Sequence, residues 1–391
     1  MNNTTVILTT VAVFGFAIVL AMPLGRIAGV KLKPGRYTQL DGMRAIAALM
    51  VVCSHYLIHA RLITGEPIGS PLKEALGAVG VQIFFCITGF LFTRKAMYGP
   101  IDVPSLISSR VRRIVPLYLF CMTAGIALAA YIASSVPGAP PVVYQDVLRA
   151  YAYGFIGGNV PSIAGMPISG QIGQVWTLSW EWTFYLFVPF IAAVVTSRTW
   201  IVAALLFLGA CALYQFQVSD QVWAFFLPGV VCGVIADKVK IGTAVSVLLF
   251  AAGVATFGAS LWMDVTPYGI TRLALCAIGF PCLLFGHQYA LSIRPLRILG
   301  EVSYSIYMVH LIFASGFYFI VANNWDIFKT PEDKILFGLV ALAGMLMFSF
   351  VTYALIERPF MKGAAIGSAT PSSPALRAVD VGAGRVASAD Q

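Results

Sequence analysis

The sequence predicts an all-α polytopic membrane protein with about eleven transmembrane helices. Hydrophobic residues make up 59% of the 391 residues and charged residues only 10%, whereas soluble domains carry about 25% charged residues. Apolar runs close to the roughly 20 residues that span a bilayer recur along the whole chain. These runs begin near residues 5, 42, 76, 114, 176, 199, 221, 242, 267, 302 and 335.

The first apolar run predicts a retained transmembrane helix and not a signal peptide. Residues 1–5 carry no positive charge, and the basic residues follow the run, which is the opposite polarity to a signal peptide. Basic clusters also follow each later odd-numbered span, and cytoplasmic loops of membrane proteins are rich in Lys and Arg. The pattern therefore predicts an outside N-terminus and a cytoplasmic C-terminus, and it accounts for the net charge of +9 without a nucleic-acid partner.

Two segments lie outside the predicted spans. The longest predicted outer connection, residues 135–175, begins with the breaker-rich run Pro137–Pro141 and contains many glycines. Such a loop is either a binding loop or a flexible connector. Residues 362–391 are rich in Ala, Ser, Gly and Pro, which predicts a disordered cytoplasmic tail and leaves any chemistry to the membrane core.

Arg44 and His55 lie eleven positions apart on the second predicted span. Eleven residues are about three helical turns and roughly 16 Å of rise, so both side chains fall on one helix face. Arg44 can then lie at the cytoplasmic interface while His55 lies near the middle of the bilayer. An ionisable group at that depth is costly and marks a candidate functional site.

Two further ionisable residues are predicted at a similar depth. Glu181 follows the outer start of the fifth predicted span by about 9 Å, and His310 lies about 14 Å from the cytoplasmic start of the tenth. Both side chains, with His55, are therefore candidate catalytic residues. The alternatives are structural: Glu181 as an ion-pair partner, and His310 as a donor to a backbone carbonyl.

Aromatic residues near the same spans are candidates for binding an acceptor. Trp176 and Trp180 open the fifth span, where they form either an interfacial aromatic belt or a stacking platform for the apolar face of a sugar. Tyr185 and Tyr307 are placed in the same acceptor-binding group. Cysteines occur only in apolar runs, so no metal site is expected.

Three arginines, Arg110, Arg112 and Arg113, stand at the predicted cytoplasmic start of the fourth span, level with Arg44. They either set the orientation of the helices or bind a ligand. Planar guanidinium groups at one mouth suit a phosphate-rich ligand. No phosphate-binding glycine loop is present, which argues against a nucleoside-triphosphatase.

The ordered motifs of the chain resemble the acyltransferase-3 family of integral-membrane O-acyltransferases. They run in the order Leu40–Arg44 leading to Ser54-His55, Gly80–Phe85 with Thr88–Leu91, Arg110–Tyr118, Leu178–Tyr185, Ser303–His310 and Ile356–Phe360. The resemblance implies transfer of an acyl group, usually acetyl, from cytoplasmic acyl-CoA to a hydroxyl of an envelope or exported glycan, free or lipid-linked. It implies no permanently bound cofactor and a bacterial cytoplasmic (inner) membrane location.

By this resemblance, the chain divides into an extra N-terminal helix with a basic linker (1–37), an acyltransferase core (38–361) and a cytoplasmic tail (362–391). The family's functional Arg and His fall on Arg44 and His55. Its arginine pair falls on Arg110 with either Arg112 or Arg113. We expect these arginines to hold the CoA phosphates and His55 to act as general base, with a covalent acyl-histidine as the alternative.

A function from a different class is also compatible with the buried groups. His55, Glu181 and His310 could form the proton relay of a proton-coupled secondary transporter. The arginine cluster at one mouth only, and the absence of a visible internal repeat, favour the acyltransferase.

Overall fold

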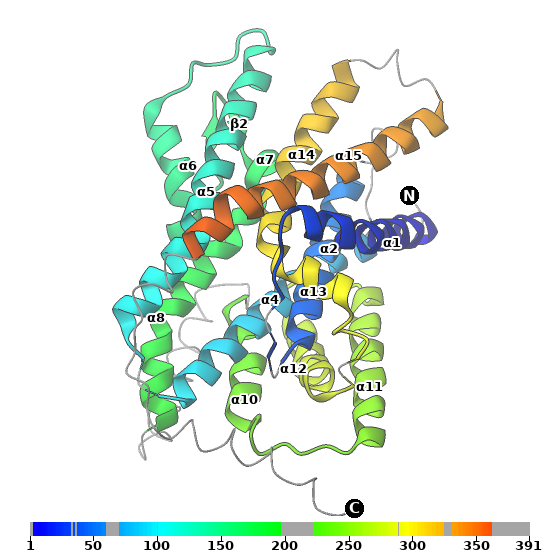
Figure 1. Ribbon diagram of the computed structural model, residues 1–391. Helices are drawn as coiled ribbons and strands as arrows, with labels where there is room; N and C mark the ends of the chain where they lie inside the picture. Colours follow the sequence, from blue (N-terminus) through cyan, green and yellow to red (C-terminus); the bar gives the residue numbers. More distant parts are fainter. Residues whose placement is uncertain are drawn as a thin grey trace, which may run out of the picture.

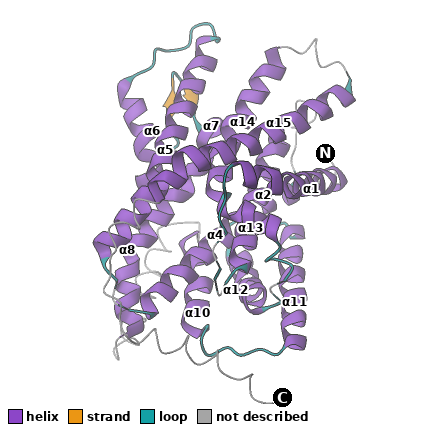
Figure 2. Cartoon of the chain, in the orientation of Figure 1, coloured by secondary structure: helices purple, strands orange, loops and turns teal. Residues whose placement is uncertain are grey.

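The computed structural model describes residues 3–32, 34–35, 37–59, 70–99, 101–196, 222–287, 289–323 and 330–361 (Figure 1). Helices form nearly all of its regular structure, as expected where a bilayer leaves no water for unpaired backbone groups (Figure 2). The α-helices are α1 (Asn3–Ile27), α2 (Gln39–His59), α4 (Pro71–Met97), α5 (Val103–Ser134), α6 (Tyr144–Ile156), α7 (Ser169–Ile172), α8 (Trp176–Thr196), α10 (Leu227–Ile235), α11 (Thr243–Trp262), α12 (Ile270–Phe285), α13 (Arg294–Glu301), α14 (Ser303–Asn323) and α15 (Pro331–Thr352). Shorter elements are the 3-10 helices η1 (Gly173–Val175) and η2 (Val222–Phe226), the π-helical turn η3 (Tyr353–Glu357) and the strands β1 (Ser162–Ile163) and β2 (Met166–Pro167).

Helix starts follow local sequence signals. Proline stands in the first turn of α4, α5 and α13, where its missing N–H has no intrahelical partner to lose. At the start of α15, the Thr330 hydroxyl accepts from the Asp333 N–H, and the Asp333 carboxylate accepts from the Thr330 N–H. This capping box fixes where α15 begins.

Helix α4 is at the centre of the bundle (Figure 1). Of its most apolar window, 78% of the residues are buried inside the protein, compared with 17% for α11. Its glycines allow close neighbours, since a Cβ on Gly89 would meet the backbone of Phe226 and one on Gly80 would meet Ala47. Helix α4 therefore carries one wall of any internal site, whereas α11 is peripheral.

Helices α13 and α14 form a broken pair, bent by 68° between Glu301 and Ser303. A break at this depth is tolerated where the freed backbone is covered by protein or lines a cavity. Here it turns Ser303 and Tyr304 toward the interior cavity described below.

The membrane helical class is confirmed, but the number of eleven spans is not. In the ranges that the structure describes, five helices are long and apolar enough to cross a membrane, or six if the bent α13–α14 pair counts as one span. Helices occur at each predicted span except the one near residue 199, which lies outside the described residues. However, two of these helical segments are too short to span a membrane fully: the segment formed by η2 and α10, and helix α12. The predicted tail, 362–391, also lies outside the described residues.

The predicted outer loop, residues 135–175, is instead folded against the bundle. Helix α6 packs on α5, where the Tyr118 hydroxyl donates to Tyr151 O at 2.9 Å and accepts from the Gly154 N–H at 3.1 Å. Strands β1 and β2 then form an antiparallel hairpin beside α5 (Figure 1), a small departure from the all-α expectation. Gln174 Nε2 donates to Met308 O at 2.8 Å, which places the start of α8 against the second turn of α14.

The backbones of α13 and α2 are in close contact, and this contact predicts how substitutions of Gly300 change the stability of the protein. A Cβ on Gly300 would lie 1.9 Å from Asp41 O, whereas one on Gly316 of α14 would meet nothing within 4 Å. We expect Gly300→Ala to destabilise the protein by about 1–3 kcal/mol through overpacking. Gly316→Ala should be neutral or stabilising by up to about 1 kcal/mol, because Ala is the better helix former.

Thermal unfolding in detergent would measure both effects. Equal unfolding temperatures for the Gly300 and Gly316 variants would show that the α2–α13 contact is not as close as the structure has it.

Candidate active site

An internal cavity of about 340 Å³ lies between α2, α4, α5, α8 and α14. Its wall contains three of the four predicted donor-binding arginines, Arg44, Arg110 and Arg113. The rest of the wall is formed by Val81, Phe84, Phe85, Ile87, Thr88, Leu91, Phe92, Lys95, Leu106, Ile114, Thr177, Leu178, Glu181, Tyr185, Ser303, Tyr304 and Tyr307. Sequence reasoning placed Tyr185 and Tyr307 with the acceptor, but the structure places both beside the arginines.

Helix phase separates the arginines of α5. Arg110 and Arg113, three residues apart, lie on one face and line the cavity. Arg112 is exposed and is not among the cavity residues. The geometry therefore favours Arg110 with Arg113 over Arg110 with Arg112 as the arginine pair.

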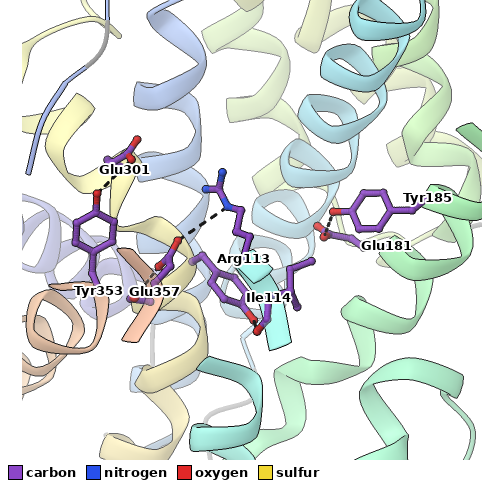
Figure 3. A network of polar contacts seen from close by, with 9 residues as sticks. Arg113, Ile114, Glu181, Tyr185, Glu301, Tyr353 and Glu357 are labelled. Carbon is purple, nitrogen blue, oxygen red and sulfur yellow. Dashed lines mark hydrogen bonds and ion pairs between the residues drawn. The ribbon is translucent and has the colours of Figure 1, made fainter. Parts of the chain in front are cut away.

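Arg113 is held by a buried carboxylate. Its Nε lies 3.9 Å from Glu357 Oε1, and Glu357 is fully buried and accepts from the Ser305 hydroxyl at 2.8 Å. Figure 3 shows Arg113 between Glu357 on one side and the Glu181–Tyr185 pair on the other. The role of Glu357 was not predicted, although it stands in one of the motifs that carry the family resemblance.

Arg44 and Arg110 differ from Arg113 in their surroundings. Within the described part of the chain, neither is held by a direct hydrogen bond or ion pair, and Nε of Arg110 is enclosed without a partner. The Arg110 guanidinium lies 5.2 Å from the centroid of the Phe92 ring, which fixes its plane by a cation–π contact. Both guanidinium groups are thus available to a ligand.

Glu181 lies with the arginines and not with the histidines. It accepts from the Tyr185 hydroxyl at 2.8 Å on the cavity wall. The predicted depth of Glu181 assumed that Trp176 starts at the outer interface. Since α8 instead begins against Met308, Glu181 lies about 7.5 Å further from that level along the helix. The structure therefore places Glu181 beside the arginines, and its common depth with His55 stays a prediction.

The cavity wall carries an excess of positive charge. Arg44, Arg110, Arg113 and Lys95 contribute four cations, and Glu181 is the carboxylate on the wall. The three arginines are partly withdrawn from water, where excess charge is unfavourable unless a counter-charge accompanies it. The cavity is consequently suited to a polyanionic ligand.

Lys95 was missed by sequence reasoning, yet its position follows from helical spacing. Val81, Phe84, Thr88, Leu91 and Lys95 recur at intervals of three and four residues, and all of them line the cavity. Lys95 is the exposed, C-terminal member of this α4 face. A basic residue at the end of an otherwise apolar face was the available signal.

His55 and His310 converge, as the sequence predicted. Nε2 of His310 lies 3.0 Å from Nδ1 of His55, and the ring centroids are 5.0 Å apart. His310 is buried, and it also contacts Tyr307 O through Nδ1 at 2.7 Å, so the backbone contact foreseen as its alternative role is present as well. Neither histidine is on the wall of the arginine cavity.

Tyr307 lies between the arginine cavity and the His55–His310 pair. Its side chain lines the arginine cavity, and its hydroxyl donates to Gln174 O at 3.0 Å and lies 2.8 Å from Thr177 Oγ1. Its ring centroid is 6.0 Å from that of His310. The histidine pair therefore lies directly behind one residue of the cavity wall.

The predicted tryptophan platform is packed into the fold. Trp176 contacts the Tyr268 ring at 5.4 Å between centroids, and Trp182 contacts Tyr185 at 5.7 Å. Trp180 packs against the hydrophobic core. None of the three lines the arginine cavity. Within the described ranges, no group of three or more His, Cys, Asp and Glu side chains is arranged to hold a metal ion.

A polytopic helical protein with a cationic internal cavity and a buried histidine pair is the class that these observations define. The chain belongs to the Acyltransferase domain family (Acyl_transf_3), which it matches over residues 37–354. It is therefore an acyltransferase of the membrane. No solved structure matches it significantly.

Curated relatives match most of the chain at low identity. The chain is 26% identical over 361 residues to BcsY of Komagataeibacter xylinus, to which membrane-bound transacylase activity is ascribed, covering 83% of this chain and 82% of BcsY. It is 27% identical over 326 residues to the exopolysaccharide production protein ExoZ of Rhizobium meliloti, covering 78% and 94%. It is 24% identical to the O-acetyltransferase OatA of Staphylococcus aureus, covering 83% of this chain but only 57% of OatA.

Proposed function

We propose that this protein transfers an acyl group, which we expect to be acetyl, from acyl-CoA to a hydroxyl of a cell-envelope or exported polysaccharide. The observation that carries the proposal is the cavity in which Arg44, Arg110 and Arg113 gather from two helices, where Arg113 is paired with Glu357 but, in the described part of the chain, Arg44 and Arg110 have no direct hydrogen bond or ion pair. Acyl-CoA carries several phosphates, and guanidinium groups bind phosphate through paired hydrogen bonds. The names of ExoZ and OatA support a polysaccharide acceptor and an acetyl donor group.

In the proposed reaction, the arginines hold the CoA phosphates while the pantetheine arm brings the thioester toward Tyr307 and the histidine pair. His55 takes the proton of the acceptor hydroxyl, and the oxygen attacks the thioester carbonyl carbon. The carbon–sulfur bond breaks with its electron pair on sulfur, and the CoA thiolate then takes a proton. A positioned base of this kind is typically worth about 10²–10⁴-fold in rate.

The proposed location is the bacterial cytoplasmic membrane, with the N-terminus outside, the C-terminus inside and acyl-CoA entering from the cytoplasm. The positive-inside pattern supports this orientation. The donor mouth then coincides with Lys95 and the arginines, and the acceptor approaches from the other face. Family membership favours this function over a proton-coupled transporter.

Mass spectrometry of envelope and exported polysaccharides tests the proposal. Cells with the intact gene should show one glycan species heavier by one acetyl mass than cells without it, and the intact gene on a plasmid should restore that species. Identical glycan profiles in both strains, with the protein present in the membrane, would refute acylation of an envelope polysaccharide.

Lys95 should strengthen donor binding from the edge of the cavity. Because it is exposed, we expect Lys95→Ala to raise the KM for acyl-CoA about two- to fivefold, the size of a surface charge interaction, with kcat unchanged. The effect should shrink as salt is raised. Lys238 is exposed outside the cavity and serves as the matched control, since Lys238→Ala should change neither constant. An equal effect of both variants would remove Lys95 from the donor site.

A further inference from the structure

The structure assigns the proton positions of the histidine pair: both imidazoles are protonated at Nδ1, so that Nε2 of His55 is the nitrogen that accepts the hydroxyl proton. His310 is then a positioning residue that, together with the carbonyl of Val51, holds the tautomer of His55. This inference rests on the proposed role of His55 as general base, and it deepens that role by naming the reacting atom.

The argument begins at Tyr307. Its backbone oxygen, 2.7 Å from Nδ1 of His310, can only accept a hydrogen bond. Nδ1 of His310 must therefore carry a proton. In a neutral imidazole the other nitrogen then has none, so Nε2 of His310 is an acceptor.

The second step is at His55. Its Nδ1 lies 3.0 Å from Nε2 of His310 and 3.0 Å from Val51 O. Both of these neighbours are acceptors, so Nδ1 of His55 carries the proton and shares it between them. Nε2 of His55 consequently holds the free lone pair.

The alternative proton arrangements leave a contact unmatched. If Nε2 of His310 also carried a proton, Nδ1 of His55 would have to accept it while facing the oxygen of Val51 as a second acceptor. If His55 were protonated at Nε2 only, its Nδ1 would face two acceptors with no proton between them. With both rings neutral, protonation at Nδ1 of each ring is the one arrangement that gives all three contacts a donor, with the His55 proton shared between two of them.

The free nitrogen is also accessible. Within the described part of the chain, Nε2 of His55 has no hydrogen-bond partner, and it is not among the fully enclosed polar atoms without partners. His55 as a whole is partly buried. The nitrogen that the pair leaves unprotonated is therefore without a partner and not fully enclosed in the described structure.

The arrangement suits a base because proton uptake requires no rearrangement of its hydrogen bonds. When Nε2 of His55 takes a proton, Nδ1–H still donates to His310 and Val51, and a charged donor strengthens both contacts. Tyr307 thereby has two functions: its side chain lines the donor cavity, and its carbonyl holds the ring that orients the base.

Solid-state nitrogen NMR of the full-length protein in lipid bilayers tests the assignment directly. The chain contains four histidines, and replacing His59 and His287 by Asn leaves the pair as its only imidazoles. With labelled histidine at mildly alkaline pH, where imidazole is neutral, nitrogen–carbon correlations distinguish Nδ1 from Nε2. We expect protonated Nδ1 and unprotonated Nε2 in both rings, and a proton on Nε2 of either ring would overturn the inference.

Two variants of His310 separate orientation from packing. A glutamine oxygen can occupy the place of Nε2 and accept from His55, whereas leucine fills space without accepting. His310→Leu removes one of the two acceptors of the His55 Nδ1–H and leaves the Val51 oxygen as the other, so it should raise the share of His55 protonated at Nε2 and lower kcat by up to about 10²-fold, with the KM for acyl-CoA unchanged. His310→Gln should keep Nδ1–H on His55 and recover at least about tenfold of that loss.

The outcomes distinguish this inference from the proposed function. Active protein with a proton on Nε2 of His55, or equal His55 tautomer populations in the Leu and Gln variants, would contradict the orientation by His310. Protein with both Nδ1 atoms protonated but without acyl transfer to any envelope glycan would count against the proposed function while leaving the proton assignment in place.

Discussion

Replacement of His55 with alanine is expected to abolish acyl transfer while the protein remains inserted and folded. Of the histidine pair, His55 is the member whose Nε2 has no partner in the described structure, so its removal takes away the group that would accept the hydroxyl proton. The expected loss in kcat is about 10²–10⁴-fold, the usual worth of general-base catalysis. Transfer of labelled acetyl from acetyl-CoA to glycan by purified protein measures it.

His287 provides the matched control for this variant. Its ring stacks on Tyr289 at 5.8 Å between centroids, and it belongs neither to the cavity wall nor to the histidine pair. His287→Ala should transfer acetyl at the parent rate. If His55→Ala retained near-parental activity with normal thermal stability, His55 would not be the base.

Lysine in place of the cavity arginines should weaken acyl-CoA binding without reorienting the helices. Arg44→Lys, Arg110→Lys and Arg113→Lys each keep the positive charge that sets topology but lose the planar fork that binds phosphate through two hydrogen bonds. A hydrogen bond to a charged group is worth about 1.5–3 kcal/mol, so the Kd for acyl-CoA should rise by about 10- to 150-fold. Calorimetric titration of detergent-solubilised protein measures the change.

Arg112→Lys is the control, since Arg112 belongs to the same cluster but is exposed outside the cavity. It should bind acyl-CoA like the parent. Unchanged affinity in all of the cavity variants would mean that the arginines serve topology alone. Arg113→Ala is the less clean probe, because it also leaves the buried Glu357 without its cation.

The sequence predicts the helices well because a bilayer demands long apolar runs, and the run containing Arg44 and His55 is recovered as α2. Helical spacing also predicted a similar depth for the two histidines, and in the structure their rings are in contact. The sequence left open whether Arg112 or Arg113 pairs with Arg110, because arginine occurs both two and three residues after Arg110. Only the way α5 is rotated against α4 decides which of the two faces the cavity.

The sequence could not predict how deep in the membrane the residues of α8 lie. Counting from Trp176 assumes that the helix starts at the membrane surface, but residues 135–175 return into the bundle and bring Gln174 to Met308. This path moves Glu181 and Tyr185 to the arginines and buries the Trp176 ring against Tyr268. The path of this segment depends on long-range packing. Its glycines and prolines predict that the chain turns, but not which part of the bundle it then contacts.

The claim that acyl-CoA enters from the cytoplasmic face and the acceptor from the opposite face is tested most directly in sealed proteoliposomes. Protein of known orientation would receive labelled acetyl-CoA on one side only, with acceptor glycan present on both sides. Acetyl-CoA supplied to the face that carries Lys95 and Arg113 should support transfer to glycan on the opposite face, and acetyl-CoA supplied only to that opposite face should not. Equal transfer from both sides in leak-free vesicles, or none from either, would contradict a cytoplasmic donor site that serves His55 across the membrane.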